Sequence, residues 1–174
     1  LFTRRGEGVE RPAASLGMGS FHTAQAQAGI SGSAQAFDYA LSASHGRSDG
    51  FNSRLSATAN PDRDGWRRSS ALARAVVQFD PQHRIDASLL AGDLRSQYDG
   101  FTPGVDDVSR HALRTGNLAW QGRWSDAATT RVQWGRTRST YETQPDFYRT
   151  ETTLHNVTLQ HDQRIGSHVL TTTL

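Results

Sequence analysis

The segment "NPDRDGW" carries oxygen-bearing side chains at every second position, on Asn60, Asp62 and Asp64, and Gly65 follows directly. Carboxylate and amide oxygens are calcium ligands, and the loop of an EF-hand begins in this way. An EF-hand loop ends on a bidentate glutamate at its twelfth position, whereas the twelfth position here is Ala71. The segment therefore resembles only the front half of a calcium loop, and a complete site would need further ligands from another segment.

The remaining polar residues give weaker indications of chemistry. The histidines show no H-E-x-x-H or comparable metal-ligand spacing, and no G-x-S-x-G elbow is present. A serine–histidine pair built on Ser42 or Ser44 is the arrangement left open for an enzyme. The sequence therefore favours a protein without catalytic activity.

Bulk composition limits the class of protein. The chain has 174 residues, 35% of them hydrophobic, and a mean hydropathy of −0.64. This is low for a compact core, and it is compatible with disorder or with a sheet that has one apolar and one polar face. A net charge of +2 is too small to imply nucleic acid, and the absence of cysteine excludes disulfides. No signal peptide and no run of about 18 apolar residues occur.

Apolar and polar residues alternate along most of the chain, which predicts β-strands. No segment shows a competing helical period. About eight strands are expected, at residues 13–21, 37–45, 71–80, 85–93, 116–124, 128–136, 155–162 and 167–174. The fold class is therefore all-β, an antiparallel up-and-down meander.

The connections alternate between two classes. Short turns are expected at 29–36, 80–84, 124–128 and 162–167, and long polar loops at 46–69, 96–115 and 139–151. Short turns on one side and long loops on the other are typical of outer-membrane barrels. Aromatic residues lie near the short turns, as an interfacial girdle would: Phe37, Tyr39, Phe79, Trp120 and Trp124.

A soluble β-sandwich is the alternative for such a pattern. The polar rows, however, carry charges that a dry sandwich core could not accommodate without partners and that a water-filled lumen could. These residues are Arg74, Asp80, Asp86, Arg123, Arg131 and Asp162. The chain also starts without Met and stops within an alternating run, so we expect one arc of a larger transmembrane barrel.

Several motifs resemble TonB-dependent outer-membrane receptors, and among these the cobalamin transporters. "LFTRRGEG" is similar to the end of the plug domain, and "AASLGMGSFHTAQAQAGISG" to the first barrel strand and its turn. "SHGRSDGFN", "NPDRDGWRRS" and "SQYDGFTPG" stand where that family has acidic extracellular loop segments. The resemblance implies that residues 1–12 end the plug and its linker, and that 13–174 form the N-terminal part of a plugged 22-stranded barrel.

In that family, aspartates of neighbouring extracellular loops bind calcium, and the ordered loops hold the corrinoid. The resemblance carries these roles onto metal ligands Asp49, Asp62, Asp64 and Asp99, with Asp106 or Asp107 as further ligands, and onto Tyr98 and Asp99 as ligand-binding residues. The first long loop also contains arginines that could neutralise the carboxylates in place of an ion. These are Arg54, Arg63, Arg67 and Arg68.

The resemblance further implies uptake of cobalamin across the outer membrane of a Gram-negative bacterium, energised by the TonB complex through the plug. The protein would contact outer-membrane lipid and catalyse no reaction. Two alternatives stay open, because a fold does not fix a ligand. One is a receptor of the same architecture for a siderophore or another ligand. The other is a passive porin or an outer-membrane barrel enzyme.

Overall fold

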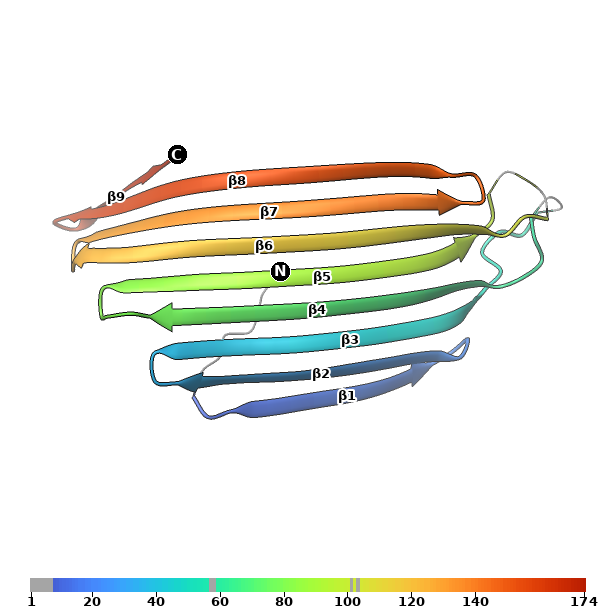
Figure 1. Ribbon diagram of the computed structural model, residues 1–174, viewed down its shortest axis with the longest axis horizontal. Coiled ribbons are helices and arrows are strands. Elements are labelled where there is room, and N and C mark those ends of the chain that lie inside the picture. The colour runs from blue at the N-terminus through green and yellow to red at the C-terminus, as the bar shows by residue number, and fades with distance from the viewer. Residues whose placement is uncertain (1–7, 57–58, 101, 103) are drawn as a thin grey trace.

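The computed structural model describes residues 8–56, 59–100, 102 and 104–174, and they form one antiparallel sheet (Figure 1). The strands are β1 (Arg11–Gly19), β2 (Thr23–Ala34), β3 (Phe37–Phe51), β4 (Asp64–Gln78), β5 (His83–Tyr98), β6 (Asp107–Ser125), β7 (Ala128–Gln144), β8 (Tyr148–Ile165) and β9 (His168–Thr173). Each strand pairs with the next one in the sequence, from β1 to β9. The predicted all-β antiparallel meander is confirmed.

The described residues form nine strands instead of the expected eight, because β2 is not among the strands expected from the sequence. Residues 29–36 were expected to form a turn, yet the segment to Ala34 lies in β2 and pairs with β3. Glycine and serine are typical of turns, but here Gly29 and Ser31 pair with both β1 and β3, and Gly32 and Ser33 pair with β3. The turn itself is confined to Gln35 and Ala36.

The register separates the side chains onto two faces. Leu41 pairs with Ala73, and Ala73 with Leu89, so these side chains share what we call the apolar face. The polar face carries the side chains in between, including Arg74 and Asp86. The alternation in the sequence therefore becomes a real difference between the two sides of the sheet.

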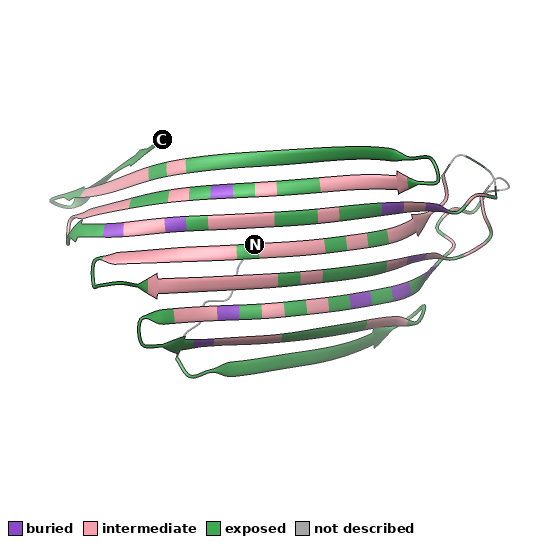
Figure 2. Ribbon diagram, in the orientation of Figure 1, coloured by how far each residue is buried: buried purple, intermediate pink, exposed green. Residues whose placement is uncertain are grey.

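The sheet has no second layer and almost no core among the described residues (Figure 2). Of the residues that the structure describes, Ala40 and Ala119 are the only buried hydrophobic ones, and both lie on the polar face. Large side chains of the apolar face are open, with Leu89 65% and Leu118 47% exposed. A sandwich would bury such residues against another sheet, and this arrangement does not.

The two ends of the strands differ in their connections. At the loop edge, residues 52–63 join β3 to β4, and residues 99–106 join β5 to β6 (Figure 1). At the turn edge, two to four residues join β2 to β3, β4 to β5, β6 to β7 and β8 to β9. The prediction of a long loop at 139–151 is wrong. β7 continues to Gln144 and β8 begins at Tyr148, so residues 145–147 alone connect them.

The expected division at residue 12 falls close to the start of the sheet. Arg11 and Pro12, expected in the linker, already pair with β2, and Leu1–Glu7 lie outside the described residues. The described part of the chain contains no helix with the length and hydropathy of a membrane span.

Candidate metal site at the loop edge

A local break in the β3–β4 pairing sets the direction in which the chain enters the first long loop. The pairing shifts between Ser48 and Phe51, where Gly50 adopts a φ of +70°. An extra residue in one strand bends it and re-aims the side chains beyond it. Here the bulge brings Phe51 opposite Asp64, the residue with which β4 begins.

Three carboxylates converge next to this bulge, and we call them the acidic cluster. Asp62 belongs to the first loop, Asp64 starts β4, and Asp99 follows β5 directly. One oxygen from each of these residues lies within 4.8 Å of the other two. Two segments far apart in the sequence therefore contribute to one cluster.

Hydrogen bonds hold the two loops together around the cluster. The backbone N–H of Asn60 donates to Asp99 Oδ1 at 3.1 Å, and the Arg54 guanidinium donates to the carbonyl oxygen of Gly100. Ser53 donates to Asp64 Oδ2 from its N–H at 2.9 Å and from its hydroxyl at 2.6 Å. The cluster is thus held by loop contacts as well as by the strands.

The electrostatics of the cluster are unfavourable for three bare carboxylates. Partial burial, together with the charges of Asp106, Asp64 and Asp99, raises the pKa of Asp62. Oδ2 of Asp99 is buried and has no hydrogen-bond partner among the described residues. A buried, unpaired carboxylate oxygen is costly unless a cation or a proton accompanies it.

The arginines considered as substitutes for a metal do not take that role. None of the ion pairs within the described ranges joins an arginine to Asp62, Asp64 or Asp99. Arg54 instead contacts the carbonyl of Gly100. The cluster therefore has no arginine as an ion-pair partner within the described ranges.

The cluster fits calcium in chemistry and in size. Calcium binds six to eight oxygens at about 2.3–2.6 Å, so ligands on opposite sides of the ion lie about 4.6–5.2 Å apart. The three carboxylate oxygens lie within 4.8 Å of one another, so they are close enough together to contact one such ion. Asp62, Asp64 and Asp99 would hold the ion, and its charge would compensate theirs.

The other candidate residues have different positions. Asp49 accepts a hydrogen bond from His22 Nδ1 at 2.8 Å and is outside the cluster. Asp107 is buried, and its Oδ2 accepts a bond from the N–H of Gly100 at 3.0 Å. Tyr98 is half-buried and pairs with Asp107 at the end of β5.

Asp106 has an intermediate position. Its Oδ2 accepts a bond from Gln97 Nε2 at 2.8 Å, and its charge acts on Asp62. Ser53 and Gln97 were not foreseen as supports of the site. Neither belongs to a recognisable motif, since their role depends on how the two loops meet.

No protein-family model matches this chain, and no curated protein is found as a relative of it.

Proposed function

We propose that the chain is an arc of a TonB-dependent outer-membrane receptor that imports cobalamin, and that its long loops bind calcium on the extracellular side. The resemblance of the loop motifs supports the class of receptor. The apolar face supports a lipid environment, because a single sheet with exposed leucines on one face needs a cover for it.

The observation that carries the proposal is the meeting of Asp62, Asp64 and Asp99 from two neighbouring loops. A metal shared by two loops would fix their relative position, which pre-organises a surface for a ligand and lowers the cost of binding. Tyr98 ends β5 and Asp99 begins the second of these loops, so an ordered loop would present Tyr98 to the corrinoid.

The test is cobalamin binding by the full-length receptor with calcium and with a chelator. We expect calcium to increase the affinity, and Asp62→Ala, Asp64→Ala and Asp99→Ala each to remove most of this increase. Asp49→Ala serves as the control, because Asp49 is bonded to His22 outside the cluster. If all three cluster variants keep the calcium effect, the metal assignment is wrong.

The alternatives give different results in the same experiment. A receptor for a siderophore or another ligand shows no affinity for cobalamin with or without calcium, although calcium still binds. A passive porin or a barrel enzyme has no plug domain and depends on no TonB complex. Loss of uptake on removal of the TonB complex therefore separates a receptor from these two classes.

A further inference from the structure

A row of arginines crosses the apolar face near the loop edge. Arg47 pairs with Arg67, Arg67 with Arg95, and Arg95 with Arg110, so four neighbouring strands place the same charge side by side. All four side chains are exposed. We call Arg47, Arg67, Arg95 and Arg110 the arginine row.

None of the ion pairs within the described residues involves the arginine row, although Glu142 stands opposite Arg110 in the register and Asp49 and Asp93 lie close to the row. These acidic side chains are bonded to other groups: Asp49 to His22 at 2.8 Å, Asp93 to Arg114 at 2.8 Å, and Glu142 to Arg149 at 3.1 Å. Like charges directly opposite on adjacent strands are destabilising. An arrangement of this kind is favourable when an external polyanion binds it, and phosphate matches the guanidinium group well.

The distance of the arginine row from the turn edge indicates which kind of anion binds it. From Val77 at the turn edge to Arg67, β4 rises by about ten residues, or about 33 Å along the strand. With a tilt of about 40°, this corresponds to about 25 Å along the membrane normal, the height of the apolar band of an outer-membrane barrel. The row thus lies where the headgroups of the outer leaflet begin.

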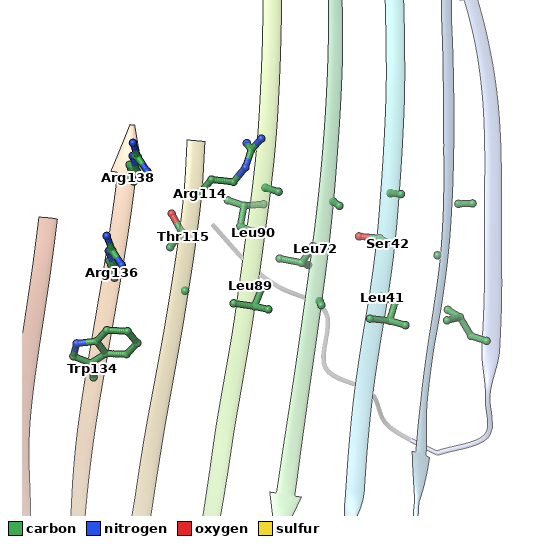
Figure 3. A pocket seen from close by; sticks show the side chains of 18 residues that line it. Leu41, Ser42, Leu72, Leu89, Leu90, Arg114, Thr115, Trp134, Arg136 and Arg138 are labelled. Carbon is green, nitrogen blue, oxygen red and sulfur yellow. The ribbon is translucent and has the colours of Figure 1, made fainter. Parts of the chain in front are cut away.

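The surface below the row suits acyl chains. A hollow of about 1030 Å³ extends over strands β2 to β7 (Figure 3). Small residues such as Ala43, Ala71 and Ala91 line it together with Leu41, Leu89 and Trp134. Three arginines, Arg114, Arg136 and Arg138, also line the hollow (Figure 3). Two smaller hollows of about 450 and 560 Å³ border the arginine row itself.

We propose that the arginine row and the hollow below it bind a phosphorylated, multiply acylated lipid of the outer leaflet. The arginines bind its phosphates, and the alanine-lined hollow receives its acyl chains. This inference rests on the outer-membrane placement proposed above, but not on the identity of the imported ligand. The site would fix the height of the barrel in the membrane and tighten the lipid around it.

The experiment measures lipid bound to the full-length receptor by native mass spectrometry. The probes are lipid A, lipid A without its phosphates, and inorganic phosphate. We expect Arg67→Gln combined with Arg95→Gln to weaken lipid A binding by at least about tenfold. The matched control is Arg68→Gln with Arg131→Gln, two exposed arginines of the polar face, which should leave binding within about twofold.

Removal of the phosphates from lipid A should weaken its binding by the same factor as replacement of Arg67 and Arg95. Equal binding of both lipids, or equal binding by wild type and the Arg67 and Arg95 variant, would overturn the proposal. Inorganic phosphate binding as tightly as lipid A would also overturn it, because the acyl chains would then contribute nothing. Cobalamin binding is measured separately, so a receptor that holds lipid A without binding cobalamin refutes only the proposed function.

Discussion

Gly50 and Asp64 face each other so closely that a methyl group on Gly50 would lie 1.8 Å from the carbonyl oxygen of Asp64. The φ of +70° at Gly50 also disfavours any residue with a side chain. Because Asp64 is a member of the acidic cluster, this contact makes the backbone of β3 part of the metal site.

Gly50→Ala should therefore weaken calcium binding although every carboxylate is retained. We expect a loss of at least about tenfold, since the clash and the backbone strain together displace Asp64. Isothermal titration of the full-length protein with calcium measures it. Gly166→Ala is the matched control, because Gly166 has a similar φ of +61° but open space around it, at the turn edge. Equal affinities for the two variants would show that the bulge does not position the site.

Calcium affinity should fall as the pH is lowered, earlier than for an ordinary aspartate site. The pKa of Asp62 is raised, so its carboxyl takes up a proton at a higher pH, and this proton competes with calcium. Affinity is full above the raised pKa and is lost as the pH falls through it. In Asp62→Asn, calcium binding should be weaker throughout, and its decline should begin at a lower pH. Parallel pH profiles for the two proteins would contradict the role of Asp62.

Stability should depend more on the polar face than on the exposed pairs of the apolar face. Arg74 and Asp86 form an ion pair with side chains only 14% and 18% exposed, whereas Arg149 and Glu142 at the loop edge are 47% and 25% exposed. Arg74→Ala leaves a half-buried carboxylate and should cost about 1–3 kcal/mol of unfolding free energy. Arg149→Ala should cost less than about 1 kcal/mol. Urea unfolding of the full-length protein in lipid vesicles compares them, and equal losses would show that burial does not distinguish the pairs.

The class of fold could be predicted because strand alternation has a period of exactly two residues. In β3 the sequence places Leu41 and Ser42 on opposite faces, and the register agrees. The prediction missed β2, where Ala24, Ala26 and Ala28 alternate with polar residues but carry too little hydrophobicity to stand out. Such a strand depends on its neighbours for its backbone hydrogen bonds.

The error at residues 139–151 has a related cause. Near the loop edge, β7 and β8 carry polar side chains on both faces, so hydrophobic alternation no longer marks a strand there. Cross-strand ion pairs such as Arg149–Glu142 contribute instead, and they cannot be recognised before the register is known.

The candidate site was predictable in part. Asp62 and Asp64 follow a recognisable spacing, and the order of the strands brings the loop of Asp99 beside them. The exclusion of Asp49 from the cluster was not foreseeable, because it depends on the contact with His22 across the β1–β2 turn. The arginine row was also missed. Its members lie far apart in the sequence, and only the register of the strands brings them side by side.

The central claim is that the apolar face contacts lipid and the polar face contacts water. Site-directed spin labels at Leu41→Cys and Ser42→Cys of the full-length receptor in bilayers test it most directly, and this chain has no cysteine of its own. We predict that the label at Leu41 is accessible to oxygen dissolved in the lipid, and that the label at Ser42 is accessible to a water-soluble nickel reagent. Labels with the opposite accessibilities, or labels at both positions shielded from both reagents as in a packed core, would contradict the account.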